Sequence, residues 1–278
     1  MTDDLVSYRF EDGLARITMP RGDRGNPIDQ AWNTAMLDAL RRARHDGARV
    51  IVLSATGRFF CVGGDLRAIP SAASPADALH DIADALHLVV SEIQRAEAIV
   101  VCSVQGAAAG AGFPLVAAAD LVVAARSASF TLGYTKVGLT VDGGTSLLVH
   151  SLGLHRAMQL ALLNRRLTAE EAAAWGLVAS VVDDDDLVPA TDELAARLLA
   201  GPGEAQATTK ALLRRAASPG IESALRREAI ELRRQAAHPD ALEGTGAFLA
   251  KRAPRFVSAA GTNVNGLEAT AAPGAGGC

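Results

Sequence analysis

Short apolar runs, separated by polar and glycine-rich breaks, predict strands along the first two thirds of the chain. Asp12-Gly13 lies between the first two runs and favours a tight hairpin turn. The runs Val50–Leu53 and Ile99–Val104 hold no charged residue, which is typical of strands covered on both faces. We expect strands at Leu5–Phe10, Leu14–Met19, Val50–Leu53, Ile99–Val104, Leu121–Ala124 and Val178–Val182.

Apolar residues at helical spacing predict helices between these strands and beyond the last one. Trp32, Met36 and Leu40 recur four residues apart and share one face of a helix. Ser74 before Pro75 marks another start, because serine is a preferred N-cap and proline suits the first helical position. The expected helices are Asp29–Arg44, Pro75–Arg95, His155–Leu163, one opened by the capping box Thr168–Glu171, Leu187–Leu199, Glu204–Arg215, Glu222–Ala236 and Leu242–Arg252. Strands and helices alternate first and helices follow, which predicts an α/β fold.

Composition excludes a disordered chain and gives no sign of a nucleic-acid partner. Of the 278 residues, 49% are hydrophobic and 21% charged, which is an ordinary globular balance. The formal net charge of −4 is too small to point to a nucleic acid. Cys61, Cys102 and Cys278 form no disulfide framework, and the acidic N-terminus lacks an apolar stretch. We therefore expect a cytoplasmic protein.

One uncharged segment, 98–119, is long enough to cross a membrane. Glycines and Pro114 interrupt it, and its first third is β-branched. These features favour a buried strand followed by a turn into a helix, so we expect no membrane partner.

Motifs for P-loop nucleotide chemistry, zincin chemistry and the hydrolase elbow are missing from the sequence. The histidines show no ligand spacing, and we expect His45, His80, His87 and His155 on helix surfaces or in satisfied core positions. We therefore expect no metal site.

Two glycine-rich segments each follow a predicted strand and lead into a helix. The first spans 58–66 and the second spans 104–113. Small residues let a backbone approach a ligand closely, and two free N–H groups aimed at one point would form an oxyanion hole. Tight packing of helix on sheet also favours small residues, so either segment alone leaves both interpretations open.

Taken together, these segments resemble the crotonase superfamily, also called the enoyl-CoA hydratase/isomerase family. The resemblance runs from about Leu5 to about Val257 and rests on many motifs in the same order. They are Arg24-Gly-Asn26-Pro, Phe60-Cys-Val-Gly-Gly-Asp65-Leu, Gln105-Gly-Ala-Ala-Ala-Gly-Ala-Gly112, Asp120, Gly143-Gly-Thr145, Leu167-Thr-Ala-Glu-Glu-Ala172, Trp175-Gly-Leu-Val178 and Phe248-Leu-Ala-Lys251-Arg252.

The resemblance implies a crotonase-like spiral of ββα units over 1–195, which binds the acyl-CoA. It also implies a helical trimerisation region over 196–257, and we expect a flexible tail over 258–278. The expected substrate is an acyl-CoA thioester; coenzyme A is part of that substrate, so no separate cofactor is expected. Family members assemble as homotrimers or dimers of trimers, and this chain is expected to do the same.

By position in the family motifs, the thioester-binding N–H groups fall on Gly64 and Ala111. Two fixed donors would stabilise the enolate oxygen more than the ground-state carbonyl. Val62 stands where the family usually has alanine, beside the adenine, and Asp65 and Leu66 belong to the same substrate-binding motif.

Hydratases of this family use two glutamates, and the matching positions here are Pro114 and Tyr134. Neither side chain is a carboxylate, and a phenol is a poor base at neutral pH. Hydration by the two-glutamate route is therefore disfavoured, and both residues are expected to contact substrate instead.

Asp142 is the carboxylate that remains near this region, just before a glycine pair that opens a helix. As a plain structural residue it would be the N-cap of that helix. The position also matches the catalytic aspartate of isomerases in the superfamily, including dienoyl-CoA isomerases and the ring-epoxide isomerases of phenylacetate breakdown. The resemblance therefore implies that Asp142 moves a proton between carbons of the acyl group.

Arg24 and Lys251 match family positions near the nucleotide end of coenzyme A, Lys251 in combination with a neighbouring subunit. Both could equally be solvated surface charges. The sequence as a whole predicts an acyl-CoA isomerase, in fatty acid or phenylacetate metabolism. Two alternatives stay open: a hydratase or lyase of the same superfamily, and a catalytically silent CoA-binding trimer.

Overall fold

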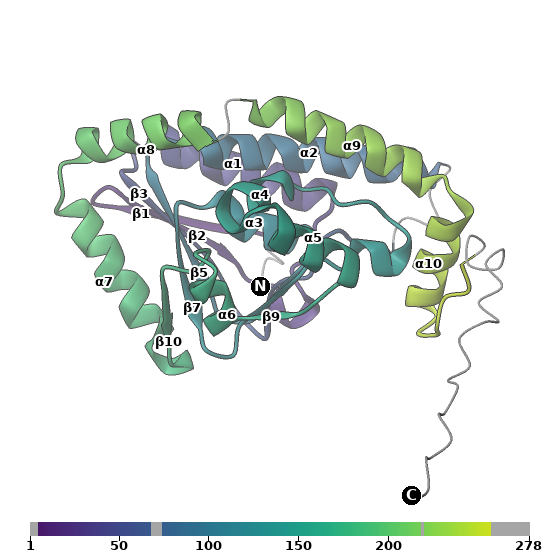
Figure 1. The fold of residues 1–278 in the computed structure, drawn as a ribbon. Coiled ribbons are helices and arrows are strands. Elements are labelled where there is room, and N and C mark those ends of the chain that lie inside the picture. Colours follow the sequence, from purple (N-terminus) through teal and green to yellow (C-terminus); the bar gives the residue numbers. More distant parts are fainter. Residues whose placement is uncertain (1–4, 68–73, 218–219, 257–278) are drawn as a thin grey trace, which may run out of the picture.

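The computed structural model describes residues 5–67, 74–217 and 220–256, which form two sheets enclosed by helices (Figure 1). The larger sheet has six strands in the order β1-β2-β3-β5-β7-β10, and the smaller has four in the order β4-β6-β8-β9. The strands of the larger sheet are β1 (Ser7–Glu11), β2 (Leu14–Met19), β3 (Val50–Ala55), β5 (Ile99–Val104), β7 (Leu121–Ala125) and β10 (Ser180–Val182). Those of the smaller are β4 (Phe59–Cys61), β6 (Ala107–Ala109), β8 (Ser129–Thr131) and β9 (Leu167–Thr168).

The chain winds as a spiral, because each turn gives one strand to each sheet. β3 is followed by β4, β5 by β6 and β7 by β8, and neighbouring turns pair in parallel. Parallel neighbours end at the same edge of a sheet. The chain segments that leave β4 and β6 therefore lie next to each other, although more than 40 residues separate them along the chain.

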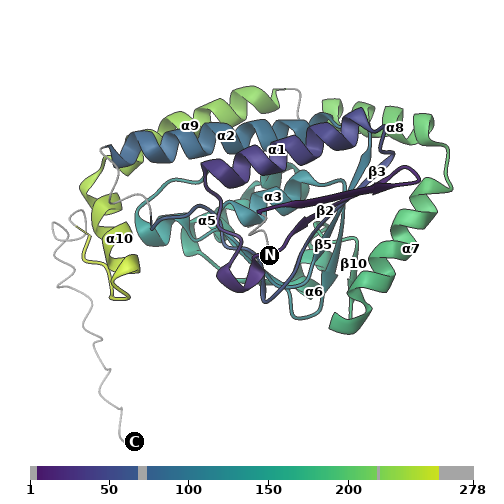
Figure 2. The same cartoon turned by 180° about the vertical axis from the view of Figure 1, so that it is seen from behind.

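Helices cover both faces of the larger sheet (Figures 1 and 2). They are α1 (Gln30–His45), α2 (Pro75–Arg95), α3 (Gly112–Ala118), α4 (Ser146–Leu152), α5 (Leu154–Leu163), α6 (Ala169–Ala174), α7 (Leu187–Leu199), α8 (Gly203–Ala217), α9 (Ile221–Ala236) and α10 (Pro239–Leu249). α7 packs Leu187 and Ala195 on Val50 and Val101, while the opposite face meets α1 and α2. This two-sided cover explains the uncharged runs of β3 and β5.

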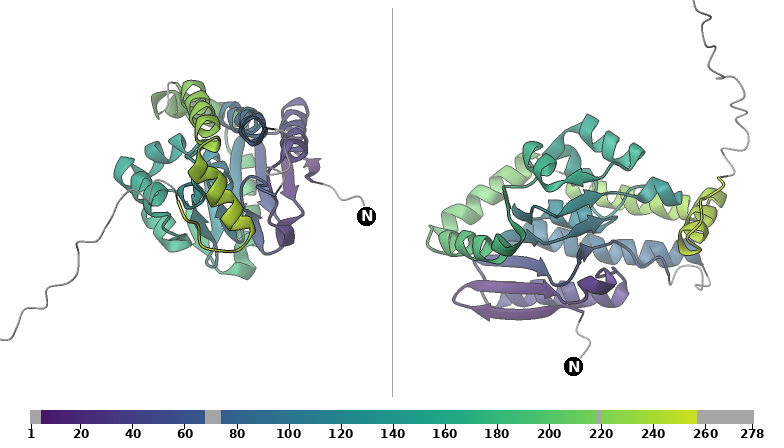
Figure 3. Two further views of the ribbon diagram at one scale, coloured as in Figure 1. Left: turned by 90° about the vertical axis from the view of Figure 1, so that its right-hand side faces the viewer. Right: turned by 90° about the horizontal axis from the view of Figure 1, so that it is seen from below.

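α2 lies between α1 and α9, and α9 packs along the length of α2 (Figure 3). α10 stands at the far end of the molecule from α7. α2 begins as predicted, since Ser74 accepts a hydrogen bond from the Asp77 amide and Pro75 is the first helical residue. α2 and α9 together form one wall of the cavity described below.

Most predicted elements are confirmed, with shifts of a few residues at their ends. The hairpin pairs Glu11 with Leu14, as Asp12-Gly13 indicated. The predicted strand at 178–182 is shorter, because only Ser180–Val182 pairs with β7. The short strands β4, β6, β8 and β9 were not predicted. The division at residue 195 stays a prediction, and the predicted tail lies outside the described residues.

Cys61 and Cys102 are buried and unpaired, as expected of a chain without a disulfide framework. Within the described helices, none has the length and apolar character needed to cross a membrane. The uncharged segment 98–119 forms β5, β6 and α3, so the expected strand and helix are present, and the connection between them contains the unpredicted strand β6.

Candidate active site

An apolar cavity of about 320 Å³ opens where β4 and β6 end. Gly64 and Ala111 contribute backbone to it, and Asp142 contributes a carboxylate. The remaining walls are mainly aliphatic or aromatic: Ile28, Val62, Leu66, Leu79, Ile82, Ala83, Leu86, Leu132, Tyr134, Val137, Leu139, Leu232 and Phe248. Few polar groups in an apolar pocket are typical of a site that orients a small ligand.

The two glycine-rich loops touch each other at the edge of this cavity. A Cβ atom added to Gly63 would lie 3.0 Å from both the Ala109 oxygen and the Ala111 nitrogen. Gly63 also has a φ of +89°, which a side chain disfavours. Glycine at this position therefore lets the loops approach closely enough to share one site.

The amides of Gly64 and Ala111 stay available in this arrangement. On either side of Gly64, the Ile28 amide donates to the Gly63 carbonyl at 2.8 Å and the Asp65 amide donates to the Ile28 carbonyl at 2.9 Å. Among the described residues, neither the Gly64 nor the Ala111 amide donates to a protein acceptor. Both can therefore donate to a ligand oxygen.

Asp142 enters the cavity from a turn that leads into α4. Gly143 and Gly144 have φ values of +70° and +90°, which only glycine adopts without strain. The Asp142 carbonyl accepts hydrogen bonds from the Tyr134 hydroxyl at 3.0 Å and the Thr145 hydroxyl at 2.8 Å. These contacts fix the backbone of a residue that is only 3% exposed.

The interpretation of Asp142 as a helix N-cap is wrong. Thr145 occupies the N-cap position of α4. The Asp142 side chain turns instead toward α2, where its Oδ1 lies 2.9 Å from Nε2 of His87. A carboxylate that capped the helix would be held by amides; this one is held by an imidazole.

Glu228 of α9 satisfies the amides that Asp142 leaves free. Its two carboxylate oxygens accept hydrogen bonds from the Gly144 amide at 2.8 Å and the Ser146 amide at 2.9 Å. A residue more than 80 positions away thus anchors the turn that carries Asp142. Burial of two carboxylates and one imidazole beside each other is costly unless they are paired, as they are here.

Sequence reasoning missed the functional placement of His87 and Glu228. The signal was present, since His87 is four residues after Ala83, on the buried face of α2. Glu228 likewise lies three residues after Leu225 and four before Leu232, both buried. Helical spacing alone does not say what a buried polar residue meets, because its partners come from other elements.

Charges in this cluster shift its pKa values. Burial lowers the pKa of His87, but the hydrogen bond and charge of Asp142, with the charges of Glu228 and Asp84, raise it above its ordinary value overall. Burial, aided by the charge of Asp142, raises the pKa of Glu228. The pKa of Tyr134 is raised well above its ordinary value, mainly by burial, so its hydroxyl acts as a donor and not as a base.

His87, Asp142 and Glu228 bring potential ligand atoms within 4.8 Å of one another. Both oxygens of Glu228 are engaged by backbone amides, and the facing imidazole nitrogen is engaged by Asp142. A cation would have to break these hydrogen bonds, so the group fits a proton-holding network better than a metal site.

The other predicted site residues divide into two groups. Val62, 39% exposed, lines the cavity with Leu66 and Tyr134. Asp65 does not line it, because both its oxygens bind the Arg67 guanidinium, which lowers the pKa of Asp65. Pro114 lies in the first turn of α3, buried and outside the cavity lining.

Arg24 and Lys251 are exposed and do not line the cavity. Phe248, on the same terminal segment as Lys251, is 60% exposed and reaches the cavity from α10. The site thus draws its outer wall from the last described helix.

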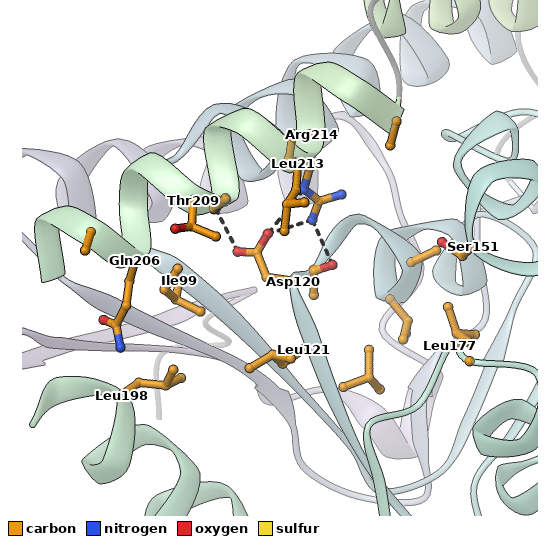
Figure 4. Close-up of a pocket in the computed structure, with 18 residues that line it drawn as sticks. Ile99, Asp120, Leu121, Ser151, Leu177, Leu198, Gln206, Thr209, Leu213 and Arg214 are labelled. Carbon is orange, nitrogen blue, oxygen red and sulfur yellow. Dashed lines mark hydrogen bonds and ion pairs between the residues drawn. The ribbon is translucent and has the colours of Figure 1, made fainter. Parts of the chain in front are cut away.

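A second pocket, of about 580 Å³, lies between α8 and the ends of β5 and β7 (Figure 4). Asp120 forms ion pairs there with Lys210 and Arg214, both at 2.7 Å, and accepts the Val100 amide at 2.8 Å. Arg214 also donates to the Ala118 and Ala119 carbonyls at 2.9 Å. These groups satisfy one another and join α8 to the sheet, which is a structural role.

The spiral fold is shared with solved proteins. A structure titled enoyl-CoA hydratase, from Mycobacterium avium subsp. paratuberculosis K-10, matches with a TM-score of 0.83 and 35% identity, over 91% of this chain and 98% of that one. The fold is therefore the α/β crotonase fold.

Sequence comparison gives the family. The Enoyl-CoA hydratase/isomerase family profile matches residues 9–259. The 1,2-epoxyphenylacetyl-CoA isomerase of Escherichia coli K12 is 35% identical, over 91% of this chain and 98% of that protein. A probable enoyl-CoA hydratase of Rhodobacter capsulatus is 37% identical, over 92% and 99%. The chain belongs to the enoyl-CoA hydratase/isomerase family, as its motifs predicted.

Proposed function

We propose that the protein is an acyl-CoA isomerase in which Asp142 moves a proton between carbons of the acyl group. One observation carries the proposal: a carboxylate that is 3% exposed lines an apolar cavity together with two amides that have no acceptor among the described residues of the protein. A base and an oxyanion-stabilising pair are the two parts that such a reaction needs.

The reaction begins with the thioester carbonyl oxygen at the amides of Gly64 and Ala111. The carboxylate of Asp142 takes a proton from carbon, and the electron pair of that C–H bond moves through the conjugated system to the carbonyl oxygen. The two N–H donors stabilise this enolate more than the neutral thioester. Asp142 then returns the proton to a different carbon, so the double bond is displaced and the enzyme is regenerated.

The surroundings of Asp142 disfavour hydration by a pair of carboxylates. Pro114 is buried in α3, and Tyr134 donates its hydroxyl to a backbone carbonyl. Glu228 is close, but both its oxygens are held by amides. The described lining of the cavity therefore offers one carboxylate, which suits proton transfer by a single base.

The apolar walls suit a hydrocarbon acyl group. Similarity to the 1,2-epoxyphenylacetyl-CoA isomerase favours a ring-epoxide or displaced-alkene substrate. In this proposal Arg24 and Lys251 bind the phosphates of coenzyme A, Val62 lies beside its adenine, and the chain works as a cytoplasmic homotrimer or dimer of trimers. No further cofactor or metal takes part.

Substitution of Asp142 by asparagine tests the proposal. Asp142→Asn keeps the size of the side chain but removes the base, so isomerisation of a 3-enoyl-CoA falls by about 10²-fold to 10⁴-fold. Turnover is followed by ultraviolet absorbance, and binding of the saturated butyryl-CoA by calorimetry. Asp38→Asn, which changes an exposed aspartate on α1, is the control and keeps wild-type turnover.

Three results would contradict the proposal. Wild-type turnover in Asp142→Asn would show that Asp142 is not the base. Hydration of crotonyl-CoA without isomerisation favours the hydratase, to which the Rhodobacter relative points. Binding of butyryl-CoA without turnover of 3-enoyl or ring-epoxide thioesters favours a silent CoA-binding protein.

A further inference from the structure

His87 lies between the substrate cavity and a second, outer pocket. On one side its Nε2 is 2.9 Å from Oδ1 of Asp142, which lines the substrate cavity. On the other side His87 itself lines an outer pocket along α2. The imidazole therefore separates the buried carboxylate from a second access route.

The outer pocket is spacious, and its largely apolar lining carries several charged side chains. Its volume is about 1000 Å³, which is ample for water, and His87 is still 8% exposed. The Nδ1 atom of His87 is 4.0 Å from Oδ1 of Asp84, whose side chain is 56% exposed. A proton can thus reach or leave Nδ1 without passing through the substrate cavity.

Acidic groups surround the imidazole on most sides. Asp84 faces it from α2, Asp142 from the turn before α4, and Glu228 from α9. The outer pocket adds Asp29, Asp81 and Arg226 to this environment. The net effect raises the pKa of His87, so its charge changes at a higher pH than that of an unperturbed histidine.

We propose that His87 is a positioning residue that sets the base strength of Asp142 from the side facing away from the substrate cavity. It exchanges protons with solvent through the outer pocket while substrate fills the cavity. This inference rests on the proposed function of Asp142. It adds that the enzyme senses bulk pH through a residue that substrate does not touch.

The charge balance follows directly. With His87 protonated, the imidazolium stabilises the Asp142 carboxylate and makes it a weaker base. Loss of the Nδ1 proton to water leaves a neutral imidazole, and the same carboxylate becomes a stronger base. In both states the hydrogen bond occupies Oδ1 and leaves Oδ2 as the oxygen for the substrate proton.

Steady-state kinetics of four proteins test the proposal: wild type, His87→Gln, His87→Phe and His80→Gln. Glutamine can donate a similar hydrogen bond but does not titrate, and phenylalanine does neither. His80 is the control, since it lies on the same helix beside Asp84, 3.4 Å away, and does not line either cavity. The kcat and KM for a 3-enoyl-CoA are measured from pH 5.5 to pH 9.

We expect kcat of the wild type and of His80→Gln to rise with pH through the raised pKa of His87. His87→Gln loses this rise and keeps kcat within about tenfold of wild type. In His87→Phe the rise is absent, and kcat is lower by about 10-fold to 100-fold, because one hydrogen bond to a charged group is lost. KM is unchanged. Because kcat reports groups in the enzyme–substrate complex, a rise in kcat shows that His87 titrates with the cavity filled.

Three outcomes would overturn the inference. The first is a rise of kcat with pH that persists in His87→Gln, and the second is a loss of this rise in His80→Gln. The third is a rise in kcat/KM but not in kcat, which would mean that protons reach His87 through the cavity. Nuclear magnetic resonance titration of the His87 ring gives a readout without turnover, and Asp142→Asn should lower its pKa. Full activity of Asp142→Asn would instead refute the proposed function.

Discussion

Two aspartates, Asp120 and Asp142, lie in the interior and have opposite surroundings. Asp120 meets Lys210, Arg214 and a backbone amide, so fixed cations hold its charge. Asp142 meets an imidazole, which can be neutral or charged, and opens into an apolar cavity. The same side chain serves as a structural clamp in one place and as a candidate base in the other.

The difference teaches that burial alone does not identify a reactive carboxylate. A guanidinium does not lose its proton in proteins, so the ion pair of Asp120 and Arg214 is fixed. The pairing of Asp142 changes when His87 changes its charge. A reactive group needs an adjustable partner and an open side, and only Asp142 of these two has both.

The largest effect on stability is expected when Asp120 is truncated. Asp120→Ala leaves Lys210, 8% exposed, and Arg214 without a counterion, which costs about 3–5 kcal/mol of unfolding free energy. Asp142→Ala should cost clearly less, because His87 can become neutral. Chemical denaturation of both variants measures the two values, and equal losses would remove the distinction.

A smaller effect is expected for Glu228→Gln. The amide group can accept from only one of the Gly144 and Ser146 amides, and the unpaired donor costs about 1–3 kcal/mol. The turn that holds Asp142 loosens, so isomerase kcat falls as well. Glu231→Gln, on the exposed side of α9, is the matched control. Unchanged stability and kcat in Glu228→Gln would show that the turn is held by its glycines and Thr145 instead.

The smallest effect is the pH dependence of stability from His87. Its folded pKa is raised, so its protonation stabilises the fold fully below about pH 6.5, the unfolded value, and this contribution is lost as pH rises through the folded pKa. The unfolding free energy of wild type relative to His87→Gln should therefore fall with rising pH in that window. A flat or rising difference would contradict the raised pKa.

Local signals were enough to predict most of the fold. Ser74 and Pro75 start α2, Thr168 and Glu171 form the capping box of α6, and uncharged runs form the central strands. The strands of the smaller sheet escaped prediction because three or fewer residues carry no usable periodicity. Their pairing depends on neighbouring turns of the spiral.

The site was predictable where backbone geometry requires particular residue types. Gly64 and Ala111 were placed by their positions in the family motifs, and the close approach of the two loops explains the neighbouring Gly63, where an added Cβ would lie 3.0 Å from the Ala111 nitrogen. His87 and Glu228 did not, because a buried polar residue is explained only by its partners. Asp142 was ambiguous for the same reason, and its bond to His87 removed the capping interpretation.

The sequence by itself determined the alternation of strands and helices and the small residues of both loops, since these follow from local periodicity and turn chemistry. The spiral and the carboxylate near the loops were implied by the resemblance of its motifs to a known family. Tertiary structure alone decided that Asp142 faces His87, that Glu228 anchors its turn, and that Asp120 is locked by cations. Those three facts join α2, α4, α8 and α9, and the contacts between distant segments arise only when the chain packs.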